Sequence, residues 1–139
     1  MANDLDKITQ NFINEIGNIQ LNEEQKRIYN AFVYRKRGMY NFCINDKYGN
    51  TIRFSMYTNK TDDGVIHILK RHYNNTLGHV TAMEILCFPE VVRVGNITAD
   101  KNTITYTMKK SGRDYSLIIG LKTTGTEKNI LKSFYSDKK

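Results

Sequence analysis

The sequence predicts an α+β domain in which N-terminal helices pack on a twisted antiparallel β-sheet. Helical periodicity dominates the first 37 residues, whereas strand-like alternation dominates 102–136. No internal repeat or low-complexity linker divides the chain of 139 residues, and its 40% hydrophobic and 25% charged residues are ordinary for a globular protein. We therefore expect a single domain over 1–139, with a helical and hairpin extension at 1–60 and a core at 64–136.

The first 60 residues are predicted to form two helices and a hairpin. Apolar residues spaced by three or four indicate a helix over 4–16. Asn22 can cap a second helix, which runs to about Arg37 and stops at Gly38. Residues 40–58 then alternate between apolar and polar side chains around a turn, which is typical of a β-hairpin.

The middle of the chain is predicted to be helical. After a loop at 59–64, a helix is expected at about 64–73, followed by a closing loop. Thr81 and Glu84 have the spacing of a capping box and indicate the start of another helix. Pro89 either interrupts that helix or opens a further one at its first turn.

The last forty residues are predicted to be β-structure. Alternating side chains indicate strands at 102–110, 115–122 and 129–136, with turns at 111–114 and 124–126.

Both cysteines are expected to be small core residues, because each lies in apolar surroundings. Cys43 and Cys87 are too few and too far apart in sequence for a disulfide framework or a zinc site. A single bridge between them stays open.

The net charge of +7 is unevenly distributed. Basic residues are in excess over 31–60 and 101–139, whereas the segment between them, which contains the histidines, has a small acidic excess. A polyanion such as nucleic acid is the simplest partner for two basic blocks. An acidic protein inhibitor would also suit this surface, and the alternative is a basic surface without a specific partner.

No apolar run approaches 18 residues, so we expect no membrane segment.

The hexapeptide HILKRH at 67–72 is the strongest candidate for a chemical site. On an α-helix, His67, Lys70 and Arg71 share a polar face, and the opposite stripe is apolar. His72 is nearer the buried flank or the helix end, about 140° from His67. Histidine can act as acid or base near neutrality, and the two cations can stabilise a phosphorane. The cations also lower a histidine pKa. The alternatives are a solvated surface histidine at 67 and a hydrogen-bonded core or capping histidine at 72.

The C-terminal strands supply the remaining candidates. Alternation places Ser133 and Tyr135 on one face of the last strand, where hydroxyls can bind a phosphate oxygen or orient a base. Basic residues interleaved with aromatic ones are candidates for contacts with RNA; they are Lys109, Lys110, Arg113, Lys122 and Lys132.

Other reaction classes lack their motifs. There is no P-loop, nucleophile elbow, dinucleotide-binding glycine pattern or HExxH motif. We expect no cofactor and no metal, and we interpret His79, in a Gly-His loop, as structural or incidental.

The layout resembles the barnase/EndoU/colicin/RelE-like nuclease superfamily, closest to its phage and contact-dependent-inhibition toxin branches. The resemblance covers 64–136 and is carried by HILKRH, by FPEVV at 88–92 and by ILKSFY at 130–135. It implies a fold of N-terminal helices on a twisted antiparallel sheet, and a metal-independent ribonuclease that cuts tRNA or other cellular RNA. It also implies an acidic immunity protein or antitoxin as a partner. The protein would act in the cytoplasm, with secretion or delivery as part of a larger protein as an alternative.

By position, the helical histidine of the superfamily falls on His67, with His72 as the second. The basic helper falls on Lys70 or Arg71, and the late Ser/Thr-x-Tyr/Phe element falls on Ser133 and Tyr135. Superfamily members have also lost or rearranged catalytic residues.

Three hypotheses follow. The first is an RNA endonuclease that uses His67 and His72, with Lys70 and Arg71 on the phosphate. The second is a non-catalytic nucleic-acid-binding module, in which the cations matter and the histidines are dispensable. The third is a phage or effector accessory protein whose basic faces dock an acidic protein.

Overall fold

The computed structural model describes residues 4–35, 41–56, 64–121 and 129–137. The expected helix stop at Gly38, most of the loop at 59–64, the turn at 124–126 and the candidate Lys122 lie outside these residues. The elements in chain order are α1 (Asp4–Ile16), α2 (Glu23–Tyr34), β1 (Asn41–Asn45), β2 (Thr51–Ser55), α3 (Gly64–His67), the π-helix η1 (Ile68–Tyr73), α4 (Ala82–Leu86), α5 (Pro89–Val94), β3 (Asn96–Ala99), β4 (Thr103–Lys110), β5 (Arg113–Gly120) and β6 (Ile130–Ser136).

The N-terminal helices follow the sequence pattern, apart from one boundary. α1 has the predicted limits, and Asn22 caps α2 through a reciprocal capping box with Gln25. α2 ends at Tyr34 rather than near Arg37, because Arg35 adopts a left-handed conformation with φ 48°. The Arg35 guanidinium donates 2.8 Å hydrogen bonds to Thr9 Oγ1 and to the Phe32 carbonyl, which hold the chain in this early stop.

One six-stranded sheet runs through the molecule in the order β1-β2-β6-β5-β4-β3. The β1–β2 hairpin, predicted from sequence, joins β6 through a single parallel register pair, Ser55 with Ile130. The sheet is therefore mixed, whereas the sequence led us to expect an antiparallel one. β3 was also missed, because four residues directly after a helix give too short a pattern to recognise; its pairing with β4 makes it a strand.

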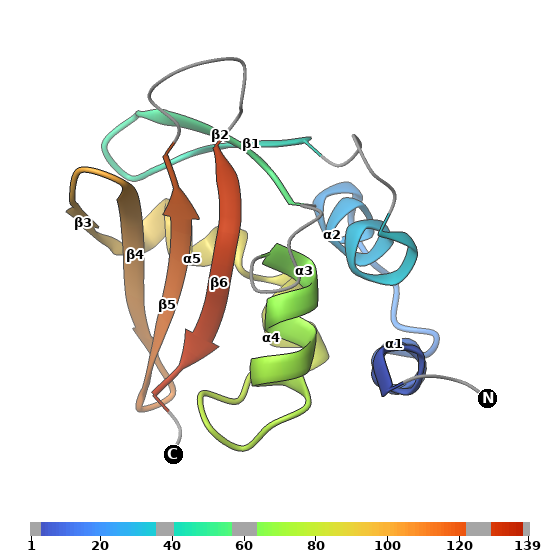
Figure 1. The fold of residues 1–139 in the computed structure, drawn as a ribbon. Coiled ribbons are helices and arrows are strands. Elements are labelled where there is room, and N and C mark those ends of the chain that lie inside the picture. The colour runs from blue at the N-terminus through green and yellow to red at the C-terminus, as the bar shows by residue number, and fades with distance from the viewer. Residues whose placement is uncertain (1–3, 36–40, 57–63, 122–128, 138–139) are drawn as a thin grey trace.

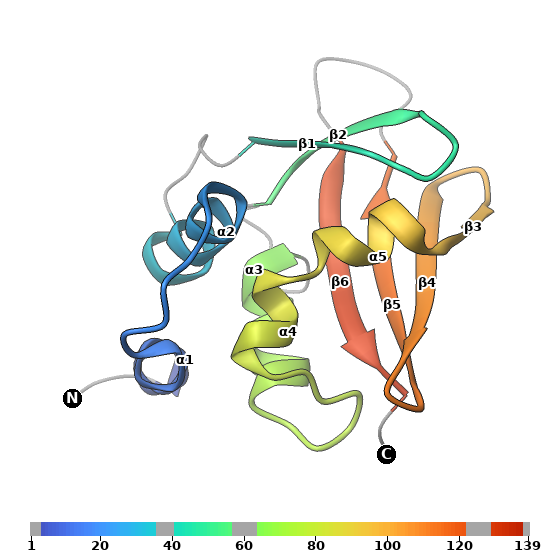
Figure 2. The same ribbon diagram turned by 180° about the vertical axis from the view of Figure 1, so that it is seen from behind.

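The helices cover one face of the sheet and leave the other face of β4–β6 uncovered. Figure 1 shows β4, β5 and β6 in front with α5 behind them, and the reverse view shows α5 in front of the strands and α4 beside β6 (Figure 2). The buried core joins α1 and α2 to the sheet through side chains such as Phe12, Phe32, Phe88 and Phe134. The predicted α+β class, with N-terminal helices on a sheet, is confirmed.

The helical segment α3–η1 lies beside β6 at the border of the uncovered face (Figure 1). α4 begins with the predicted capping box of Thr81 and Glu84, and Pro89 opens α5 at its first turn. No helix in the described part of the chain has the length and apolar character needed to cross a membrane.

The cysteine prediction is wrong for one residue. Cys43 is exposed, since the buried side chains of β1 are its neighbours Phe42 and Ile44. Cys87 is half-buried, and both thiols are free.

Candidate functional site

The helix that carries the two histidines changes its winding between them. α3 is α-helical as far as His67, and the next six residues form a π-helix, in which hydrogen bonds join residues five apart. The Asn74 amide donates to the Leu69 carbonyl at 3.0 Å, which is such a five-residue bond. Residues five apart therefore stack on one face here. The predicted α-helical face of His67, Lys70 and Arg71, with His72 about 140° away, is wrong for this reason.

His67 and His72 form a pair. Their ring centroids lie 5.1 Å apart with the planes at 69°, an edge-to-face contact. Both side chains are half-buried, whereas Lys70 and Arg71 on the same turn are exposed. The structure thus brings the histidines together, and the two cations are exposed and do not line the same cavity.

A bulge in β6 brings the C-terminal candidates to the same place. Ser133 pairs with Ile118, but Leu131 pairs with Ile119, so Lys132 is an extra residue between two register positions. This bulge lets Leu131 lie in the core while Ser133 faces the uncovered side. Ser133 and Tyr135 share a face as predicted, and the Tyr135 ring centroid lies 5.3 Å from that of His72.

These groups line one cavity of about 580 Å³ at the border between the helix and the sheet. Its described lining residues come from η1 and its neighbours, β5 and the end of β6; they are His67, His72, Leu77, Gly78, Ile118, Ser133, Tyr135, Ser136 and Asp137. The sequence did not identify Leu77, Gly78, Ile118, Ser136 or Asp137 as candidates. Only Gly78 gave a signal, as the glycine of a loop next to a histidine.

The loop after η1 fixes the position of His72. Nδ1 of His72 lies 3.5 Å from the Leu77 carbonyl oxygen, which can only accept a hydrogen bond. Nδ1 therefore donates, and Nε2 keeps the lone pair of a base. Ser136 holds this loop against β6: its amide donates to the Gly78 carbonyl and its hydroxyl to the His79 carbonyl, at 3.2 and 2.6 Å.

The surroundings lower the pKa of His72 below its usual 6.5. Burial is the largest cause, because it penalises the imidazolium, and the adjacent His67 ring is the second. The Leu77 carbonyl acts in the opposite direction, and Arg71 adds a further lowering effect. The lowered pKa favours the neutral, proton-accepting form of His72. The sequence also predicted a lowered pKa, from the neighbouring basic residues.

The Ser133 hydroxyl is a buried polar group without a partner. The residue is 7% exposed, and within the described part of the chain its Oγ makes no hydrogen bond. Buried hydroxyls are normally hydrogen-bonded, so an exception in the wall of a cavity points to a ligand that completes it.

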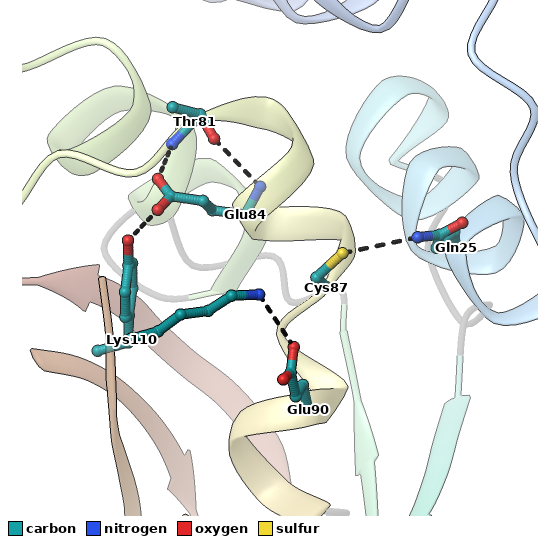
Figure 3. Close-up of polar contacts among 7 residues, drawn as sticks. Gln25, Thr81, Glu84, Cys87, Glu90 and Lys110 are labelled. Atoms are coloured by element: carbon teal, nitrogen blue, oxygen red, sulfur yellow. Dashed lines mark hydrogen bonds and ion pairs between the residues drawn. The ribbon is translucent and has the colours of Figure 1, made fainter. Parts of the chain in front are cut away.

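The predicted RNA-binding cations within the described residues do not converge on this cavity. Lys109 is exposed at the end of β4, and the half-buried Lys132 side chain lies over Gly120 of β5. Lys110 and Arg113 line a second, smaller hollow of about 260 Å³ between the β4–β5 turn and the helices. There Lys110 pairs with Glu90 of α5 at 3.3 Å, as Figure 3 shows.

The second hollow is organised around side chains that bond to one another. Glu84 accepts hydrogen bonds from the Thr81 amide and the Tyr115 hydroxyl, and the Gln25 side-chain amide lies 3.6 Å from Cys87 Sγ (Figure 3). These contacts join α2, α4 and β5. We therefore interpret Glu84, Cys87 and Tyr115, which line this hollow, as structural links.

His79 lies outside the histidine pair. Its Nδ1 is 3.0 Å from the Asn75 carbonyl oxygen in its own loop, in keeping with a structural role. No group of three or more His, Cys, Asp or Glu side chains suited to a metal ion occurs among the described residues.

Comparison of the chain with protein-family models, curated proteins and solved structures gives no match. The resemblance to the nuclease superfamily therefore stays a prediction from its short motifs, and the site is interpreted from its own geometry.

Proposed function

We propose that this protein is a metal-independent RNA endonuclease whose reaction takes place at the His67–His72 pair. The observation that carries the proposal is the pair itself: two imidazoles in contact at the mouth of a cavity, one of them biased toward its neutral form. Cleavage by the 2′-hydroxyl needs one group to remove a proton and another to deliver one. Two adjacent histidines can divide these two roles, one imidazole acting in its neutral form and the other in its protonated form.

The lowered pKa of His72 assigns it the role of base. Nε2 of His72 takes the proton of the 2′-hydroxyl, and the 2′-oxygen attacks the phosphorus. The bond from phosphorus to the 5′-oxygen breaks, and that oxygen takes a proton from the His67 imidazolium. The products are a 2′,3′-cyclic phosphate and a free 5′-hydroxyl. The attacking 2′-oxygen and the leaving 5′-oxygen lie on opposite sides of one phosphorus, so base and acid must reach a single phosphate from two directions. Two imidazoles with ring centroids 5.1 Å apart can serve one phosphate in this way.

Lys70 and Arg71 are proposed to act on the phosphate from outside the cavity. Both are exposed on η1, the element that carries His72, and Arg71 is close enough to influence the His72 pKa. Cations at this position stabilise the additional negative charge of the phosphorane. Cellular RNA, including tRNA, is the substrate class that we propose.

The test is incubation of the purified protein with total cellular RNA in EDTA, together with His67→Ala and His72→Ala variants. We expect cleavage by the wild type and a loss of about 10²- to 10⁴-fold in each variant, the usual contribution of a general acid or base. His79→Ala is the matched control, because His79 lies outside the pair, and it should cleave at the wild-type rate. Intact RNA with the wild-type protein, or equal loss in all three variants, contradicts the proposal.

A further inference from the structure

We propose that the cavity beside the histidine pair is a pocket for one unpaired nucleobase, so that the protein selects single-stranded RNA. The inference rests on the proposed function for its substrate class. It concerns a different part of the substrate, since the reaction takes place at the phosphate and the pocket binds the base.

The charges of the cavity exclude the phosphate from its interior. No lysine or arginine occurs among the described lining residues, and Asp137 contributes a carboxylate at the end of β6. Away from the histidine pair, a phosphate inside would lose water without gaining a cation, which is unfavourable. The exposed Lys70 and Arg71 attract it instead to the solvent side of the histidines.

The apolar surfaces of the cavity suit a flat aromatic ring. Tyr135 and Ile118 contribute from the sheet, and Leu77, which is 65% exposed, contributes from the loop. An exposed leucine costs little by itself, but here it lines the same cavity as an aromatic side chain. Bases of single-stranded RNA bind proteins by stacking on such side chains.

The polar groups of the cavity suit the edge of a base. The Ser133 hydroxyl is buried and unpartnered within the described residues, and it can turn about a single side-chain angle. A base that enters the cavity brings ring nitrogens and exocyclic groups that can bond to it. Asp137 can accept from an N–H donor of the same base. Ser133 is therefore the residue that we assign to base selection.

Duplex RNA does not fit this arrangement. The edges of paired bases are occupied by the opposite strand, and their faces are covered by their neighbours in the stack. A base reaches Tyr135 and Ser133 only when it is unpaired.

The experiment measures binding and does not depend on cleavage. Three dye-labelled 12-nucleotide probes carry 2′-fluoro groups, which prevent attack by a 2′-hydroxyl: a single strand, the same strand in a duplex, and a single strand without bases. Fluorescence anisotropy gives the dissociation constants at one salt concentration. We expect the single strand to bind about tenfold or more tightly than either other probe.

Variants locate the effect. Tyr135→Ala is expected to weaken binding of the single strand roughly 5- to 150-fold, the range for loss of one stacked base, without changing binding of the abasic probe. Tyr135→Phe should keep most of the affinity. Tyr48→Ala is the control, because Tyr48 is an exposed aromatic residue on another turn. Single strands made of one base alone (A, C, G or U) test Ser133. Ser133→Ala should make the dissociation constants of these four strands more alike.

The outcomes separate this inference from the proposed function. Equal affinity for the three probes, or equal effects of Tyr135→Ala and Tyr48→Ala, overturns the base pocket even if RNA is cleaved. Base-dependent binding that Tyr135→Ala removes supports the pocket even if the RNA stays intact, in which case the endonuclease proposal alone fails.

Discussion

Gly78 is predicted to be the residue that makes room for His72. A Cβ atom at this position would lie 2.8 Å from Nδ1 and 3.2 Å from Cε1 of the His72 ring. Contacts between real Cβ atoms and other heavy atoms are rarely shorter than 3.4 Å, so the ring or the loop must shift by about 0.6 Å. Gly78 also has φ +68°, which costs a residue with a side chain about 1–2 kcal/mol.

We expect Gly78→Ala to destabilise the protein by about 2–5 kcal/mol, because overpacking typically adds about 1–3 kcal/mol to the backbone term. At roughly 2–4 °C per kcal/mol, thermal unfolding followed by circular dichroism should show a clear decrease in Tm. The RNA-cleavage rate should fall by more than the loss of folded protein explains, since a displacement of about 1 Å can cost about 10²-fold.

Gly49→Ala is the matched control for this prediction. Gly49 has φ +85° and nothing within 4 Å of the added Cβ, so the substitution introduces the backbone strain without the contact. NMR spectra of the histidine ring nitrogens should change for His72 in Gly78→Ala and stay unchanged in Gly49→Ala. Equal decreases in Tm for the two variants, with an undisturbed His72 signal in both, would refute the reasoning.

Three further predictions concern the site and its surroundings. The pKa of His72, measured by NMR, should lie below 6.5 and should move up toward that value in His67→Ala. Because His72 binds a proton more readily in the unfolded chain than in the folded protein, the free energy of unfolding should decrease as the pH falls through 6.5 toward the folded pKa. Ser133→Ala should leave the Tm of the free protein unchanged or raise it by the equivalent of up to about 1 kcal/mol, since it removes a buried hydroxyl without a partner among the described residues; a large decrease would show that Oγ is already satisfied. Tyr115→Phe should cost about 1–3 kcal/mol in chemical denaturation, because it removes the phenol that bonds to Glu84. Because the pKa of Tyr115 is raised to about 12, ultraviolet titration near pH 10 should find the same number of ionising tyrosines in the variant as in the wild type.

The elements of the fold followed from local patterns in the sequence. The capping residues Asn22 and Thr81 identified two helix starts, because a cap depends on groups within one turn. Pro89 left two alternatives open, and the structure selects the start of α5. Alternation of polar and apolar side chains identified the hairpin and three C-terminal strands, because this pattern is also carried by a few consecutive residues. β3 was missed, since a strand of four residues is defined mainly by the neighbour that binds it.

The candidate site was predicted in its residues but not in its geometry. The sequence indicated His67, His72, Ser133 and Tyr135, because their chemistry is a property of the side chains alone. Their meeting depends on two local irregularities, the π-helix η1 and the bulge at Lys132. Regular spacing, at 100° per residue for a helix and 180° for a strand, placed the two histidines apart and gave no sign of the bulge.

The sequence by itself thus determined the class of fold, the approximate position of most helices and strands, and a set of groups able to transfer protons. Only the tertiary structure decided that the two histidines touch, that the cations stay outside the cavity, and that Gly78, Ile118 and Asp137 belong to its wall. The physical reason is that a π-turn and a β-bulge are local departures from regular hydrogen bonding, which persist because the packed structure around them is more stable with them. Packing between segments distant in sequence is not encoded in any local pattern.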